Sequence, residues 1–173
     1  VVGLDEGTAV ITAKCGKAAS SCTVTVTGEL LPFSDLAAGA WYYDDMRFAT
    51  AKEILNGTGD GHMEPSGLVS WPAALQIVYN FAGRPGAKSE IPNWYGEALA
   101  WAQDNGLLDG LTFDTEKAVG RAEMVTLLYR FAQKKNQKLT TDTNLEDFAD
   151  ADTVPAYAQE AARWAVGCGI LKG

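Results

Sequence analysis

The stretch VGRAEMVTLLYRF, residues 119–131, has a near-copy fifty positions earlier in VSWPAALQIVYNF, residues 69–81. In both stretches apolar side chains recur at the spacing i, i+3, i+4, i+7, which is typical of one face of an amphipathic helix. Ser70 and Gly120 stand at equivalent positions where a helix cap is expected, and Pro72 falls in the first turn, where a missing N–H is tolerated. The sequence therefore predicts two related helices that bury the same face. The stripes are Ala74, Ile77, Val78 and Phe81 in the earlier copy and Met124, Leu127, Leu128 and Phe131 in the later one.

A second repeated element precedes each of these helices. Residues 41–57 (WYYDDMRFATAKEILNG) align without gaps on residues 94–110 (WYGEALAWAQDNGLLDG), and residues 157–173 (YAQEAARWAVGCGILKG) align on both. Aromatic residues, alanines and closing glycines share columns, and a glycine suits the exit from a helical segment. The repeating unit is therefore predicted to be helix, glycine-containing loop, helix. By this alignment the chain holds two and a half units, and the third is expected to stop before its second helix.

The first 27 residues follow a different pattern. In TAVITAKC and CTVTVT, β-branched residues alternate with small or polar ones, which predicts the two strands of a hairpin. Cys15 and Cys22 flank the turn and could form a cross-strand disulfide. The alternative is a register set by a tight turn at Gly16 and Lys17, which would pair Cys15 with Ala18. The residues GLDEGTAVITA and CTVTVTG resemble the end of a bacterial immunoglobulin-like domain of group 2.

The composition argues against several classes of function. Acidic residues outnumber basic ones, 22 to 14, and a net charge of −8 disfavours nucleic acid as a partner. No apolar run approaches the roughly 18 residues that suggest a membrane span, and no signal segment opens the chain, so we expect a piece of a longer protein without membrane insertion. One histidine and three cysteines at non-ligand spacing predict neither a metal centre nor a cofactor. No nucleophile with a base and no carboxylate pair stands at diagnostic spacing, so no catalytic residues are predicted and an enzyme is not expected.

From Phe33 to Gly173 the order of motifs resembles the S-layer homology (SLH) domain. Phe33-Ser34-Asp35 is followed by Trp41-Tyr42, by an alanine- and aromatic-rich helix ending in ILNG or GLLDG, and by a helix that opens with VGRAE. The resemblance implies a mainly α fold, in which repeats of helix-loop-helix form an incomplete pseudo-threefold bundle. The implied domains are residues 1–28 for the immunoglobulin-like strands and residues 29–173 for the SLH module, with repeats at about 33–84, 88–135 and 146–173.

The resemblance also implies a function, which is non-covalent anchoring of an exported bacterial surface protein to the cell wall. The partner would be an acidic, pyruvylated wall polysaccharide outside the cell. A guanidinium recognises a carboxylate through two hydrogen bonds and stays charged, so Arg121 is the expected anchor, with Gly120 and Glu123 beside it at the start of a helix. Trp71 and Trp41 are the candidate aromatic faces for a sugar ring. Because the first repeat carries Trp71 in place of the arginine, we expect one full site at most and weak binding.

These interpretations have structural alternatives. Arg121 could instead pair with Glu123 or Glu116 on the surface. Trp71 could mark a repeat that has become purely structural. The whole module would then be a structural or protein-interaction spacer of a surface protein, without glycan binding.

The remaining tryptophans and one loop carry further predictions. Trp94, Trp101 and Trp164 fall at core-like helical positions, whereas Trp41 begins its helix and is the aromatic side chain most expected to be exposed. The loop at residues 59–64 offers carboxylates that a calcium ion could use, but its spacing is not that of an EF-hand. Met63 aligns with Phe113 as an apolar plug, so a structured loop without calcium is expected.

The third repeat gives a prediction about association. Without its own second helix, its first helix is expected to lack part of its cover. The uncovered side chains would be Ala161, Trp164, Ala165 and Leu171. They would form an apolar patch covered by the hairpin or by another chain, which makes self-association through the truncated repeat a possible partner interaction.

Overall fold

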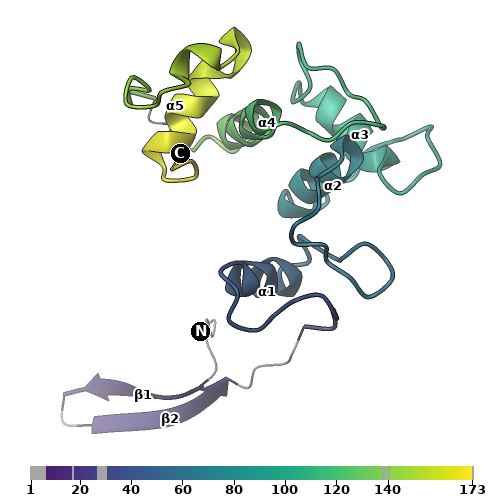
Figure 1. Cartoon of the computed structure of the whole chain (residues 1–173). Helices are drawn as coiled ribbons and strands as arrows, with labels where there is room; N and C mark the ends of the chain where they lie inside the picture. The colour runs from purple at the N-terminus through teal and green to yellow at the C-terminus, as the bar shows by residue number, and fades with distance from the viewer. Residues whose placement is uncertain (1–6, 17, 27–30, 138, 140, 173) are drawn as a thin grey trace. The chain divides into compact units, whose positions relative to one another are not determined.

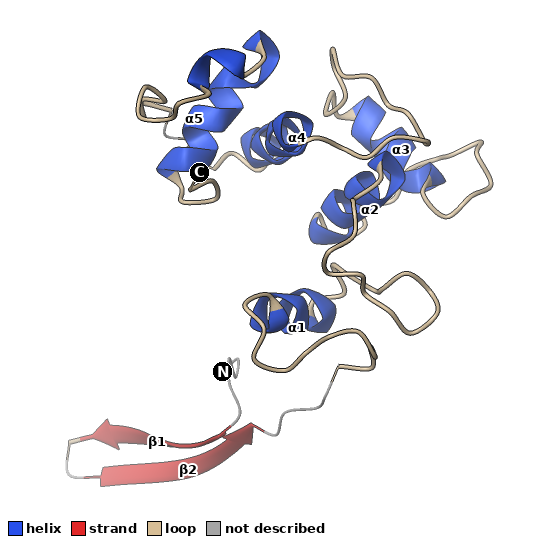
Figure 2. Ribbon diagram, in the orientation of Figure 1, coloured by secondary structure: helices blue, strands red, loops and turns tan. Residues whose placement is uncertain are grey.

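The computed structural model describes residues 7–16, 18–26, 31–137, 139 and 141–172 (Figure 1). The described chain begins with one antiparallel hairpin, and its other regular elements are helices joined by loops (Figure 2). The predicted mainly α fold with an N-terminal β element is confirmed. The chain divides into two compact units. The first holds the residues up to 51 together with 56–65, and the second holds residues 52–55 together with those from 66 onward.

The hairpin pairs β1 (Gly7–Cys15) with β2 (Ala18–Val26). Its register places Cys15 opposite Ala18 and Cys22 opposite Ile11. This is the register expected of a tight turn, and Gly16 takes the positive φ, 61°, that such a turn requires. Cys22 is a free thiol, so the alternative of a cross-strand disulfide is not realised. The immunoglobulin-like resemblance of these strands and a domain boundary after residue 28 stay predictions.

Both predicted second helices form, and both begin where the caps were expected. The first, α2 (Trp71–Phe81), starts after Ser70, whose hydroxyl accepts a hydrogen bond from a first-turn N–H at 3.3 Å, and Pro72 lies in that first turn. The second, α4 (Arg121–Lys134), starts after Gly120. Both helices therefore begin in the same column of the alignment.

The three first helices also agree with the repeat alignment. The helices α1 (Tyr43–Ala51), α3 (Gly96–Asp104) and α5 (Gln159–Gly167) are each nine residues long and begin in the same column of the alignment. Shortly after each helix one column takes a left-handed backbone, which reverses the chain direction. The residues in that column are Glu53, Gly106 and Gly169, with φ of 55°, 67° and 71°.

A side chain of each second helix ties down the loop that follows the first helix. In one copy the Asn80 amide donates to the Ile54 carbonyl oxygen at 3.1 Å, and in the other the Arg130 guanidinium donates to the Leu107 carbonyl oxygen at 2.7 Å. Both donors occupy one column of the alignment, and so do both acceptors. The contact is therefore kept although the donor is an amide in one copy and a guanidinium in the other.

The second unit has a core in two parts. In the first part α2 packs on α3, and α4 adds Leu127 and Phe131 to this cluster. In the second part α4 packs on α5, which two short 3-10 helices precede, η1 (Ala151–Thr153) and η2 (Ala156–Ala158). The second cluster consists of Val125, Tyr129 and Ala132 from α4 and of Ala161, Trp164 and Ala165 from α5.

The prediction that the third repeat lacks cover is wrong. Ala161, Trp164 and Ala165 are buried, and Leu171 packs against the same cluster. The cover comes from α4, the second helix of the preceding repeat, which turns one apolar face to α2 and α3 and another to α5. The sequence argument assigned the cover to the wrong helix, so its basis for self-association through this repeat is gone.

Three of the four tryptophan predictions hold. Trp41 is 87% exposed, Trp164 is buried, and Trp101 packs against the first core cluster. The prediction for Trp94 is wrong, because its side chain is 64% exposed. Trp94 lies in the turn before α3 and contacts the Tyr95 ring edge-on at 5.3 Å between centroids, so the helical spacing that predicted burial does not apply to it.

The glycine-rich loop of the first unit is ordered by its own contacts. Met63 is buried, as expected of a plug, and the Asp60 carboxylate bonds the imidazole of His62 and the hydroxyl of Thr58. Among the residues placed by the structure, no group of three or more His, Cys, Asp or Glu could hold a metal ion. A search of the same residues finds no helix with the length and apolar character needed to cross a bilayer.

Candidate functional site

Arg121 is the first residue of α4, and backbone pairing holds the chain before it. The Val119 N–H donates to the Val69 carbonyl oxygen at 2.8 Å, and the Trp71 N–H donates to the Lys117 carbonyl oxygen at 3.3 Å. The segments that lead into α2 and α4 are thus antiparallel neighbours. This pairing fixes where α4 begins and therefore where the Arg121 side chain leaves the backbone.

Glu123 completes the start of the helix and does not pair with Arg121. Its carboxylate accepts a hydrogen bond from the Gly120 N–H at 2.7 Å, which is the acidic half of a capping box. A Cβ at position 120 would collide with this carboxylate. A larger residue at the cap would therefore require the flexible Glu123 side chain to shift.

The guanidinium of Arg121 is exposed and bonds to none of the residues that the structure describes. Glu123 is occupied by the cap. Glu116, the other candidate partner, accepts instead from the Thr115 hydroxyl at 3.3 Å. The surface ion pairs considered as the alternative do not form, so the guanidinium keeps its capacity to bind a carboxylate through two hydrogen bonds.

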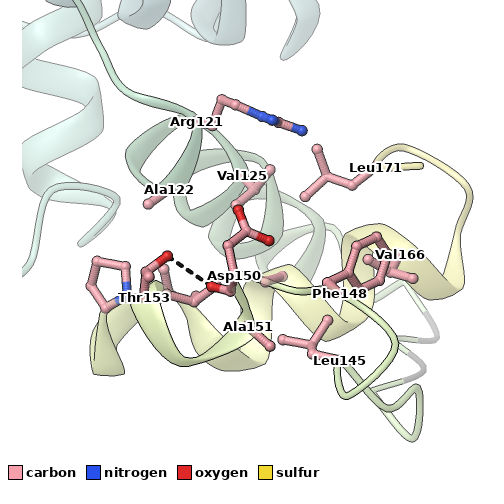
Figure 3. A pocket seen from close by; sticks show the side chains of 14 residues that line it. Arg121, Ala122, Val125, Leu145, Phe148, Asp150, Ala151, Thr153, Val166 and Leu171 are labelled. Carbon is pink, nitrogen blue, oxygen red and sulfur yellow. Dashed lines mark hydrogen bonds between the residues drawn. The ribbon is translucent and has the colours of Figure 1, made fainter. Parts of the chain in front are cut away.

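Arg121 stands at the edge of a pocket of about 290 Å³ (Figure 3). In this view the guanidinium extends across the pocket toward Leu171, and the Asp150 carboxylate rises from the loop beneath it. The volume is close to the lower end of the range for small-ligand sites, about 300–1,000 Å³. The lining residues are Arg121, Ala122, Val125, Leu145, Phe148, Asp150, Ala151, Thr153, Val154, Pro155, Ala158, Ala162, Val166 and Leu171.

Asp150 was not predicted as a site residue. Its carboxylate engages no residue of the described chain, while its backbone carbonyl oxygen accepts from the Thr153 hydroxyl at 2.7 Å. In the equivalent Asp35 of the first repeat, both carboxylate oxygens accept hydrogen bonds from the N–H groups of Met63 and Glu64. The shared Phe-x-Asp motif marked the position, but the motif alone did not indicate that one acid would be occupied and the other free.

Tyr157 is a second residue that the sequence reasoning missed. It shares an alignment column with Trp41 and Trp94, and all three are exposed; the exposed fraction of Tyr157 is 44%. It lies in η2 next to Ala158, which lines the pocket. Desolvation raises the pKa of its hydroxyl, and the Glu123 carboxylate adds to the rise. The segment η2 contacts α4, so Tyr157 belongs to an element that packs on the helix that Arg121 begins.

The two tryptophans that were predicted to offer a face to a sugar ring differ in their exposure. Trp71 is only 3% exposed and packs edge-on against Phe113, with 6.3 Å between ring centroids. Its ring serves the core and presents no face to a ligand, as the structural alternative for this residue expected. Trp41 is exposed but belongs to the first compact unit, whereas Arg121 belongs to the second. The structure therefore groups Arg121, Gly120 and Glu123 and gives no placement of Trp41 beside them.

Comparison with known proteins finds a family model that matches part of the chain. Residues 32–70 match the family model of the S-layer homology domain. The chain is 20% identical over 163 residues to an endoglucanase of Bacillus sp. (strain KSM-635), and 27% identical over 130 residues to the surface-layer 125 kDa protein of Lysinibacillus sphaericus. These alignments cover 90% and 69% of this chain, but the chain spans only 17% and 10% of the two relatives.

The matched residues contain the first repeat only. They run through Phe33-Ser34-Asp35, α1 and the glycine-rich loop, and they end at Ser70, the cap of α2. For this stretch the predicted S-layer homology domain is confirmed. The Arg121 pocket lies in later copies, which are tied to the matched repeat by the equal lengths and aligned starts of the first helices.

Proposed function

We propose that this chain is an anchoring module that holds a bacterial surface protein to the cell wall by binding an acidic polysaccharide at the Arg121 pocket. The S-layer homology match and the relation to a surface-layer protein support the location outside the cell and the wall as partner. The observation that carries the proposal is a guanidinium without a described partner at the edge of a pocket with largely apolar walls.

The chemistry of the pocket suits a sugar that bears a pyruvate ketal. Its carboxylate would take two hydrogen bonds from the Arg121 guanidinium, and the N–H groups at the start of α4 favour a negative charge nearby. The ketal methyl group would lie against apolar wall residues such as Val125 and Leu171. Asp150 would accept a hydrogen bond from a hydroxyl or amide group of the sugar, because its carboxylate bonds to none of the residues that the structure places.

Tyr157 supports the same ligand class. Sugar rings stack on aromatic faces through their C–H groups, and an exposed tyrosine beside a pocket offers such a face. Tyr157 takes over the role for which Trp71 was proposed, since Trp71 is buried. Gly120 and Glu123 contribute by setting the start of α4 and not by touching the sugar.

A spacer without glycan binding is the second candidate. The observation in its favour is Trp71, which occupies the arginine position of the first repeat and is buried. One of the two second helices therefore lacks the arginine of the motif. We propose no catalytic role. The chain matches an endoglucanase, but it spans only 17% of the length of that relative.

Co-sedimentation with purified cell-wall sacculi separates the two candidates. We expect the chain to be retained, and Arg121→Ala to lose about tenfold to a hundredfold in affinity, the effect of removing a charged hydrogen-bond donor. Arg163→Ala is the matched control, since Arg163 is an exposed arginine of α5 outside the pocket. Absence of retention at low salt would favour the spacer.

A further inference from the structure

Three consecutive residues of the first unit fasten the glycine-rich loop at residues 57–64. We call Phe33, Ser34 and Asp35 the clasp. The Phe33 ring lies so close to Gly57 that a Cβ there would collide with it. The Ser34 N–H donates to the Gly61 carbonyl oxygen at 3.0 Å. The Asp35 carboxylate accepts from two backbone N–H groups at 2.7–3.1 Å.

His62 stands between this clasp and the rest of the loop. Its Nδ1 lies 3.0 Å from Oδ1 of Asp60, and its Nε2 lies 3.3 Å from Oγ of Ser34. The Thr58 hydroxyl donates to the same Asp60 oxygen at 3.1 Å and holds it in place. One imidazole therefore links two segments that are 28 positions apart in the sequence.

The order hydroxyl, imidazole, carboxylate is also that of a serine hydrolase triad. A hydrolase needs free backbone donors beside the serine to stabilise an oxyanion. Here the Ser34 N–H is already bonded to Gly61, and the Ser34 hydroxyl faces the same carbonyl oxygen at 3.5 Å. These contacts bind the loop and leave the serine poorly placed for attack, so we interpret the group as structural.

We propose that His62 is a pH-dependent latch that fastens residues 57–64 to the clasp. In the neutral ring Nδ1–H donates to Asp60 and Nε2 accepts from the Ser34 hydroxyl. In the charged ring both nitrogens donate, and the Ser34 hydroxyl turns toward the Gly61 carbonyl oxygen. Ser34 can thus bond to either form, but only the charged form adds attraction to the acids around it.

The acids that face the ring are Asp60 from its own loop and Asp35 from the clasp. The hydrogen bond to Asp60 and the charge of Asp60 raise the pKa of His62, burial opposes the rise, and Asp35 adds to it. Because the folded-state pKa is raised, the stabilisation by charged His62 is fully present below the unfolded pKa, about 6.5. Its contribution is lost as the pH rises through the folded-state pKa.

The chain itself makes the titration easy to read, because His62 is its only histidine. A two-dimensional NMR titration of the imidazole C–H signals from about pH 5 to about pH 9 therefore needs no assignment. We expect a pKa above the ordinary value of 6.5, and a return toward that value in Asp60→Asn. Asp152→Asn, an exposed acid of the second unit, is the control. A pKa at or below the ordinary value would overturn the proposal.

Amide hydrogen exchange tests the latch itself. After correction for base catalysis, the N–H groups of Met63 and Glu64 should exchange on the order of two- to fivefold faster once His62 has lost its proton, the size expected of an exposed ion pair. His62→Gln keeps a hydrogen-bonding side chain without a titration, so the step should vanish while the helical circular dichroism signal stays. Exchange that shows no step at the measured pKa, or a step that survives in His62→Gln, would contradict the latch.

Discussion

The Glu123 carboxylate lies 2.7 Å from the Gly120 backbone nitrogen and accepts its hydrogen bond. This contact uses the acid nearest to Arg121 in the motif and so leaves the guanidinium to face the pocket. A residue that seemed a competitor for Arg121 is therefore the one that keeps the arginine available.

The cap makes a first prediction. Glu123→Ala should lower the free energy of unfolding by about 0.5–2 kcal/mol, the typical cost of losing a helix cap. Denaturant unfolding followed by circular dichroism measures it. Glu116→Ala should stay within about 0.5 kcal/mol, because the Glu116 carboxylate accepts a hydrogen bond from its neighbour Thr115 alone among the described residues, and the bond from its backbone N–H to Asp114 does not depend on the side chain. Equal effects of the two changes would show that the cap carries no special stability.

The burial of Trp71 makes a second prediction. Trp71→Ala should cost about 3–5 kcal/mol of stability, as large-to-small changes of buried aromatics do. The change Trp71→Arg, which restores the arginine of the repeat motif, should unfold the second unit and not create a second site, because it buries an unpaired charge. Trp41→Ala is the matched control and should stay within about 0.5 kcal/mol. Thermal melts of the three variants measure these differences in stability. A stable Trp71→Arg protein would contradict the role of Trp71 in the core.

The repeated tie between helix and loop makes a third prediction. Asn80→Leu removes the donor to the Ile54 carbonyl oxygen and the acceptor for Gln76 and Arg84. Leaving such groups without partners costs about 1–3 kcal/mol. Gln137→Leu, at an exposed position after α4, should have little effect in the same urea titration. A neutral Asn80→Leu would show that water replaces the tie at no cost.

Acid should release the clasp, which is the fourth prediction. Desolvation raises the pKa of Asp35, but the hydrogen bonds from the Met63 and Glu64 N–H groups outweigh it, and the pKa lies below its ordinary value. A lowered folded-state pKa means that the contribution of Asp35 is complete above the unfolded pKa, about 3.9, and is lost as the pH falls through the lower value.

The measurement compares wild type with Asp35→Asn in thermal melts between about pH 2 and about pH 6. We expect the wild type to be the more stable above the unfolded pKa and the two proteins to converge as the pH falls. Asp142→Asn, at an exposed position of the second unit, is the control. A gap that stays constant down to the lowest pH would contradict a role for the Asp35 charge.

The repeating framework could be predicted from the sequence because it depends on local signals. Helical stripes, caps and glycines at helix ends act within a few residues, and α1, α3 and α5 formed in the columns that the alignment predicted. The tight turn of the hairpin was equally local. The tight turn at Gly16 was one of two alternatives that the sequence offered, and the observed register follows it.

What could not be predicted depends on neighbours that are distant in the sequence. The source of the cover over α5 was not predicted, because a single apolar stripe does not reveal that α4 will pack on two sides. Trp94 lies in the turn before α3, so helical spacing misjudged its exposure. Asp150 matched Asp35 in sequence but not in its contacts, because only Asp35 meets the N–H groups of the following loop.

The central claim is that Arg121 captures the carboxylate of a wall sugar, and a binding cycle tests it most directly. Calorimetry would measure four affinities, those of wild type and Arg121→Ala for pyruvylated wall polysaccharide and for the same polymer after mild acid removal of the ketal. We expect that losing the arginine, losing the ketal, or losing both weakens binding to the same extent. If Arg121→Ala binds the intact polymer as tightly as wild type does, or if removing the ketal weakens both proteins equally, the account is contradicted.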